Sequence, residues 1–266
     1  MSEQAMDETT RPRHGSSRWL LSILVLGAFA VLCSLGTWQV SRLYWKEALI
    51  DSVETRIHAP PQALPAVAEW PSLKADDIQY RRVAFDAVYD HSKEIHVFIA
   101  LGSPKGAIGG QGYFVVTPAT LADGKVILVN RGFVPLERKD PATRPEGQVT
   151  GVQHIVGLMR PPEVASWLSP ANDTVKNVWF TRNPAEMAAA DGIDPSAVAP
   201  FTVDAEAGEA PGGLPQGGET IVSFPNSHLQ YAVTWFGLAA ALVAVYVAYL
   251  LRGHGSRSRE PGSKAD

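Results

Sequence analysis

Two long uncharged runs, one near each end of the chain, limit what this sequence can fold into. Trp19 to Trp38 and Tyr231 to Leu251 contain no Asp, Glu, Lys or Arg. A helix of about 20 residues rises about 30 Å, which is the thickness of the hydrocarbon core of a bilayer. The stretch from Gln39 to Gln230 holds no apolar run of that length. We therefore predict two transmembrane α-helices that bracket one extramembrane domain.

The basic residues of the two tails predict the orientation of these helices. Lys and Arg are frequent before the first run and after the second, whereas residues 211–230 contain neither. The positive-inside rule then places both tails in the cytoplasm and the domain in the periplasm of a bacterium, with the chain in the inner membrane. The predicted parts are a cytoplasmic tail (1–18), a first span (19–38), a periplasmic β-rich domain with its linkers (39–230), a second span (231–251) and a cytoplasmic tail (252–266).

The first run also fits a cleaved signal peptide. Arg11, Arg13 and Arg18 form a basic start, and Ala28-Phe29-Ala30 offers a small-x-small cleavage pattern. The apolar run continues to Trp38, however, which is longer than a typical signal core. We favour a retained helix for that reason.

Charge and cysteine content exclude several classes of function. The net charge of −4 combines an acidic domain with a basic C-terminal tail, which argues against nucleic acid as a partner. The single cysteine, Cys33, lies in the first apolar run, so the domain has neither a disulfide nor a thiolate metal site. Insertion of Cu(I), which needs soft ligands, is therefore not expected of it.

The domain is predicted to be mostly antiparallel β, as a sheet or barrel, with one or two short helices. In Arg81 to Asp90, alternation puts apolar side chains on one face. Asn183-Pro184 is a typical helix start, and the first span should continue as a helix to about His58. Residues 205–220, rich in Gly and Pro, predict a flexible approach to the second span. The other expected strands are 94–100, 111–118, 125–135, 149–160, 177–180 and 199–205.

No pattern in the domain indicates an enzyme. There is no nucleophile elbow, phosphate loop or metal-ligand spacing, and we expect structural or surface roles for His91, His96 and His154. Asn130-Arg131-Gly132 looks like a corner at the end of a strand, where glycine takes a backbone shape that other residues avoid. We predict a structural or partner-binding role for these three residues.

Polar and aromatic residues gather where the two spans meet the outer boundary. Asn226 or Ser227 can cap the second helix, which places His228 in its first turn. Tyr231 and Trp235 follow His228 on one helical face, and the first span ends with Trp38, Gln39 and Arg42. An imidazole, aromatic walls and a guanidinium suit a haem, but interfacial aromatic residues are also common without one. The residues alone leave both interpretations open.

Three blocks resemble the Surfeit-locus family of cytochrome c oxidase assembly factors. They are GTWQVSRLYWKEALI, VNRGFVP and PNSHLQYAVTWFGLA. The resemblance implies a two-span protein with an external β-rich domain that binds haem a and helps to place it in oxidase subunit I. It implies that His228 is the haem iron ligand and the only metal-binding residue. It also implies that the chain works with the haem a biosynthetic enzymes and with membrane lipid.

Two other classes of protein are alternatives to this haem-handling assembly factor. A structural chaperone would brace nascent oxidase subunits without binding haem. A two-span sensor is disfavoured, because about 15 residues after the second helix are too few for an output domain. In no case do we expect a catalytic residue.

Overall fold

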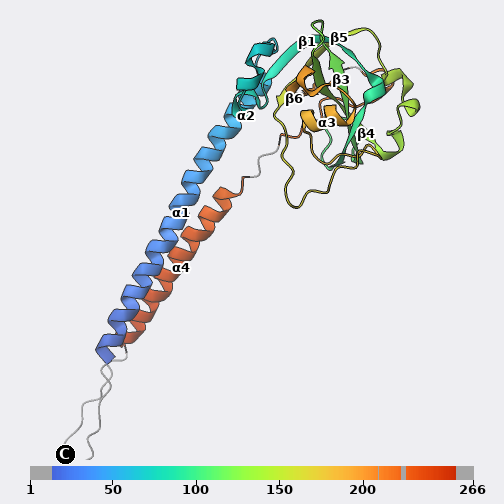
Figure 1. The fold of residues 1–266 in the computed structure, drawn as a ribbon. Coiled ribbons are helices and arrows are strands. Elements are labelled where there is room, and N and C mark those ends of the chain that lie inside the picture. Colours follow the sequence, from blue (N-terminus) through green and yellow to red (C-terminus); the bar gives the residue numbers. More distant parts are fainter. Residues whose placement is uncertain (1–13, 209, 223–225, 256–266) are drawn as a thin grey trace, which may run out of the picture. The chain divides into compact units, whose positions relative to one another are not determined.

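The structure is a computed structural model that describes residues 14–208, 210–222 and 226–255. The chain divides into two compact units. Of the described residues, 14–50 and 226–255 form the helical unit, and 51–208 and 210–222 form the barrel domain. Figure 1 shows the elements of both.

The helical unit consists of two long helices, α1 (His14–His58) and α4 (His228–Gly255). By length and composition both can cross a membrane, as the two uncharged runs predicted. As expected, α1 continues past its apolar run, and its last residues belong to the barrel domain. The two helices make a two-pass membrane protein the natural interpretation.

Small residues let α1 and α4 lie side by side (Figure 1). Gly36 on α1 is buried, and a Cβ atom there would stand 2.7 Å from Cζ of Phe236 on α4. Ala232 and Ala239 are the buried alanines of α4. Such close approach through small side chains is the usual way that helices pack in lipid, where apolar burial supplies no driving force.

The barrel domain is built on six strands, five of which close into a barrel. The strand order is β1-β5-β6-β4-β3-β2, and an additional β1–β3 pairing closes the ring. Among the strands, β2 pairs only with β3, and it extends the sheet outside the barrel. All pairings are antiparallel except β4 with β6, which is parallel. The strands are β1 (Arg82–Tyr89), β2 (Ile95–Leu101), β3 (Gly110–Thr120), β4 (Val126–Pro135), β5 (Val152–Arg160) and β6 (Val198–Ala205).

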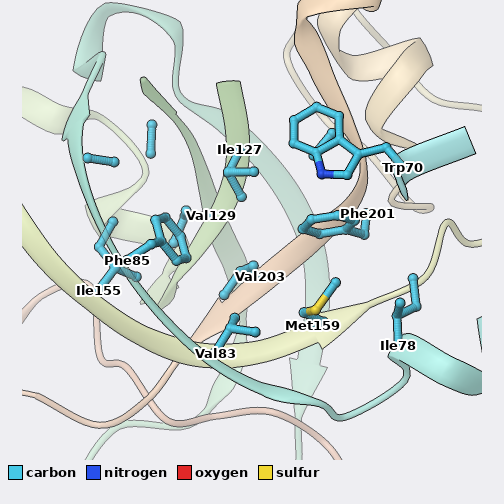
Figure 2. Packing of buried hydrophobic residues seen from close by; sticks show 13 residues of the cluster. Trp70, Ile78, Val83, Phe85, Ile127, Val129, Ile155, Met159, Phe201 and Val203 are labelled. Carbon is cyan, nitrogen blue, oxygen red and sulfur yellow. The ribbon is translucent and has the colours of Figure 1, made fainter. Parts of the chain in front are cut away.

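Alternating apolar side chains fill the inside of this barrel. On β1, Val83, Phe85 and Ala87 are buried, which confirms the alternation seen in the sequence. Figure 2 shows Val83 and Phe85 packed with Phe201, Met159 and other core residues. A second apolar cluster covers the outside of β2, β3 and β4 and includes residues of α3 (Pro184–Ala190). β4 is buried along nearly its whole length because both of its faces are covered.

Two predictions for the domain need correction. Residues 177–180 form only isolated bridges, through Val178 and Trp179, and no strand. The segment before the second span is also less flexible than its composition predicted. Leu214 and Glu219 are buried, and Gln216 forms an antiparallel bridge with Phe133 of β4. Glycine and proline there shape a segment that packs against the barrel.

Short helices complete the barrel domain. Asn183 caps α3 by accepting a hydrogen bond from the Ala185 amide, as predicted. α2 covers Ala75–Ile78. The 3-10 helices are η1 (Val67–Ser72), η2 (His91–Lys93), η3 (Leu136–Arg138), η4 (Pro141–Thr143), η5 (Pro145–Gly147), η6 (Pro195–Ala197) and η7 (Pro211–Gly213).

Candidate functional site

His228 is the first residue of α4, and its side chain is held by a residue of α1. The His228 amide donates to Oδ1 of Asn226 at 3.4 Å, so Asn226 contributes to the helix start. Nδ1 of the imidazole lies 2.7 Å from Oε1 of Gln39. Gln39 is buried, with 9% of its surface exposed, whereas His228 is only partly buried. This contact joins the two polar sets that the sequence placed at one level of the membrane.

The Gln39 contact determines which nitrogen of His228 is available. An amide oxygen only accepts hydrogen bonds, so Nδ1 carries the proton when it faces Oε1. Nε2 then keeps its lone pair, which is the form of imidazole that binds metal ions. A hydrogen bond from the other ring nitrogen is also what orients histidine ligands at known metal sites. With Nδ1 as the donor, the pair therefore presents Nε2 of an imidazole at the start of α4.

Among the described residues, the other residues predicted for this site form no hydrogen bond with the Gln39–His228 pair. Trp38 and Tyr231 each expose 53% of their surface, and Trp235 is partly buried. The guanidinium of Arg42 lies over the ring of Trp45 at 4.7 Å, and Arg42 is exposed. These side chains provide flat apolar surface and one cation close along the helices to the imidazole, without forming an enclosed pocket.

Asn130 and Gly132 have structural positions inside β4. Asn130 donates to Oδ1 of Asp204 at 3.0 Å and accepts from the Gly132 amide at 3.1 Å. Gly132 has φ 132°, and a Cβ atom there would lie 2.1 Å from the carbonyl oxygen of Gln216. The prediction that glycine is required holds, but the strand does not end in a corner. β4 continues to Pro135, and its register against β3 shifts between Val115 and Val116.

Arg131 belongs to a buried charge cluster that we define as Glu94, Arg131 and Arg144. Nη1 of Arg131 lies 3.3 Å from Oε1 of Glu94, and Nη2 of Arg144 lies 2.5 Å from Oε2. All three side chains are at most 8% exposed. Arg131 also donates to the Gly147 carbonyl and stacks on Tyr89 at 4.9 Å. The cluster ties β4 to the residue just before β2 and to the loop that follows β4.

Electrostatics in this region follow from burial. Burial raises the pKa of the Glu94 carboxyl, but the hydrogen bond and charge of Arg144 and the charge of Arg131 outweigh it, so the net pKa is lowered. Burial raises the pKa of Tyr89 to about 12 and lowers the pKa of His96 to about 4. His96 is therefore neutral near pH 7, which agrees with the structural role expected for it.

A second ionic group joins Arg182 to Asp204 and Glu163. Nη1 of Arg182 donates to Oδ1 of Asp204 at 2.8 Å, and Nη2 donates to Oε1 of Glu163 at 2.6 Å. The sequence did not predict a role for these residues or for Glu94, because the ion-pair partners of each are distant in the sequence. The one local signal was Asp204, a carboxylate inside a mostly apolar strand.

No arrangement for a bare metal ion is present in residues 14–208, 210–222 and 226–255. Groups of three or more His, Cys, Asp or Glu side chains in metal-binding geometry are absent there.

Known proteins similar to this chain identify its family. The family model described as the SURF1 family matches residues 26–240. Surfeit locus protein 1 of Xenopus tropicalis is 36% identical over 246 residues, which cover 88% of this chain and 76% of that protein. Its human counterpart is 36% identical over 247 residues, covering 89% of this chain and 78% of that protein. The SURF1-like protein of Rickettsia conorii is 32% identical over 235 residues, covering 87% of this chain and 91% of that protein. The chain belongs to the SURF1 family of cytochrome c oxidase assembly factors.

Proposed function

We propose that this chain binds haem a at the periplasmic boundary of the inner membrane and aids its insertion into subunit I of cytochrome c oxidase. The observation that carries the proposal is the 2.7 Å contact between Gln39 and His228. It leaves Nε2 of a partly exposed imidazole free to bind iron at the point where two membrane helices meet. Subunit I and the haem a biosynthetic enzymes are the proposed protein partners.

The residues present fit a haem in their chemistry. Haem supplies an iron that accepts an axial imidazole, and that ligand would be His228. Gln39 holds the ring in the required tautomer. Tyr231 and Trp235 offer aromatic surface on the same helical face, and Arg42 offers a cation suited to carboxylates.

The proposed role of these residues is binding and release, with no bond-breaking step. His228 would bind through the lone pair of Nε2 while Nδ1 stays bonded to Gln39. A partly exposed ligand can be replaced by the ligands of a receiving subunit. Trp38 and Tyr231, both half exposed, leave one side of the site open to such a partner.

Orientation is part of the same proposal, with both tails in the cytoplasm and the barrel domain in the periplasm. The support is the basic character of the tails and the two membrane-competent helices. Alkaline phosphatase fused near Lys125 should be active, and a cytoplasmic reporter should be active after Leu251. Activity with the two reporters exchanged would reverse the orientation.

A spectrum of the purified chain tests haem binding directly. The full-length protein is co-expressed with the enzymes that make haem a, and the wild type should carry a haem a absorption band. His228→Ala should insert normally, because the apolar run of α4 is unchanged, and should lose most of the band. His154→Ala is the matched control, because His154 is an exposed imidazole of the barrel domain paired with Asp86. Wild-type haem content in His228→Ala would contradict the proposal.

A structural chaperone remains the second candidate, and one observation favours it. The loop that follows β5 exposes 91% of Val164, 90% of Trp167 and 71% of Leu168. Exposed apolar side chains grouped in this way mark surfaces that bind other molecules. If the chain never carries haem, and Trp167→Ser alone blocks oxidase assembly, the chaperone function replaces the haem-binding one.

A further inference from the structure

An apolar groove lies between α1 and α4, deeper in the membrane than His228. It has a volume of about 590 Å³ and is lined by residues of both helices. Ala28, Val31 and Leu32 line it from α1, and Leu238, Ala241 and Leu242 line it from α4. The alanines leave room that larger residues would fill. The groove is therefore an elongated apolar recess within the helical unit.

The groove continues the face of α4 that carries the aromatic residues of the haem site. From Tyr231 the chain reaches Trp235, Leu238 and Leu242 in steps of four, three and four residues. Steps of three and four follow one face of a helix. Tyr231 and Trp235 therefore lie on the same stripe as the groove residues Leu238 and Leu242.

α1 shows the matching stripe. Trp38 follows Val31 by seven residues and Ala28 by ten, spacings that keep all three on one side of the helix. Arg42 is one further step of four along it. Both helices thus lead from the residues assigned to the haem down to the lining of the groove.

The depth of the groove suits a long chain attached to a ring at His228. At about 1.5 Å rise per residue, Leu32 lies about 10 Å below Gln39, and Ala28 lies about 16 Å below it. On α4, Leu238 and Leu242 lie about 15 and 21 Å below His228 on the same scale. An occupant that also reaches His228 therefore needs an extended hydrocarbon tail of about 10–20 Å, within a hydrocarbon core about 30 Å thick.

We propose that this groove receives the isoprenoid tail of a haem a held at His228. The inference rests on the proposed function and specifies its ligand. Only a haem with such a tail would occupy both the site at His228 and the groove. A free lipid chain would fill the same recess, since lipid is as apolar as the groove. The tail has the advantage of being tethered: once the ring is bound, the tail is present at high effective concentration.

Two haems that differ in the tail show whether the tail contributes to affinity or whether the ring alone is bound. Haem o carries the isoprenoid tail, and haem b has a vinyl group in its place. The full-length chain in lipid nanodiscs is titrated with each haem, and the dissociation constant is read from the absorption change. The groove predicts that wild-type protein binds haem o more tightly than haem b.

Neighbouring alanines of α4 provide the test variant and its control. Both alanines are exposed, but Ala241 lines the groove and Ala240 does not. Ala241→Phe should weaken haem o binding about five- to ten-fold and leave haem b binding unchanged. Ala240→Phe should change neither. Ala28→Leu fills the groove from α1 and should reproduce the effect if Ala241→Phe inserts poorly.

The outcomes distinguish this inference from the proposed function. If Ala241→Phe and Ala28→Leu both bind haem o like the wild type, the groove belongs to lipid and the inference fails. If both phenylalanine variants weaken haem o equally, the tail has no specific place and the inference also fails. If the wild type binds neither haem, or if His228→Ala binds both unchanged, the proposed function itself fails.

Discussion

Replacing Gln39 tests whether its contact with Nδ1 orients the imidazole of His228 for the proposed haem binding. Gln39→Leu keeps a side chain of similar size in a buried position but removes the acceptor for Nδ1. The hydrogen bond itself contributes about 0.5–1.5 kcal/mol, so helix packing should survive. The imidazole would then be free to rotate and to change tautomer.

The expected loss of affinity is larger than that hydrogen bond alone. Removing the hydrogen-bond partner of a histidine ligand typically costs about 10–100-fold in metal affinity, because ring orientation and basicity are both lost. We expect Gln39→Leu to bind haem about ten-fold more weakly, since His228 is partly exposed and water can replace the amide oxygen. Gln39→Glu keeps an oxygen acceptor and should retain most of the affinity.

Titration of the full-length chain in nanodiscs with haem o measures this effect. Gln230→Leu is the matched control, because Gln230 is an exposed glutamine in the first turn of α4. Wild-type affinity in Gln39→Leu would refute the view that Gln39 presets the ligand. If Gln230→Leu weakened haem o binding equally, the loss of affinity would come from the altered membrane boundary and not from Gln39.

Three further predictions concern the barrel domain of the intact chain. Glu94→Gln leaves two buried guanidinium groups without their carboxylate and should cost about 3–5 kcal/mol, which lowers Tm by about 6–20 °C. Asp86→Asn, in an exposed pair, should change Tm little, and equal shifts would contradict the burial argument. Gly132→Ala should cost at least about 3 kcal/mol, because its Cβ would meet backbone atoms; a wild-type Tm would show that β4 can shift. His96 has a folded-state pKa of about 4, below that of an unfolded histidine, so its contribution to stability is lost as pH falls from about 6.5 to 4. His96→Phe should flatten the Tm–pH curve in that window, and an unchanged curve would count against burial as the cause.

Local pattern was enough to predict most elements of this fold. Uncharged length gave the two spans, and alternation with turn residues gave β1 to β6 within a few residues of their bounds. The cap at Asn183 and the N-terminal end of α4 followed from side chains that bond to nearby amides. These features depend on residues that are close to each other in the sequence, so they can be predicted from the sequence alone.

Long-range pairing could not be read in the same way. The parallel β4–β6 pair and the β1–β3 closure join strands whose patterns are equally compatible with other orders. Glu94 and Arg144 are separated by 50 residues, and neither stands in a recognisable motif. The strand expected at 177–180 was wrong, because four residues rich in aromatic and β-branched types can also form isolated bridges.

The candidate site was partly predictable because it lies on two straight helices. Regular rise along a span sets the level of each residue, so Gln39 and His228 could be expected at one depth before their contact was known. The groove was not foreseen, since it depends on how the side chains of α1 and α4 pack against each other. Small residues along the two helices permit such a recess without requiring it.

Polar groups differ in burial and pairing between the barrel domain and the helical unit. In the barrel domain, Glu94 and Asp204 have their charges satisfied by arginines in buried positions, which makes exchange with an outside group costly. In the helical unit, His228 has one nitrogen bonded and is only partly buried. A protein that must release what it binds needs the second arrangement, because a ligand at an exposed imidazole can be exchanged without unfolding anything. Under the proposed function, the barrel domain would supply a fixed surface for the receiving subunit, and the helix boundary would supply the exchangeable ligand.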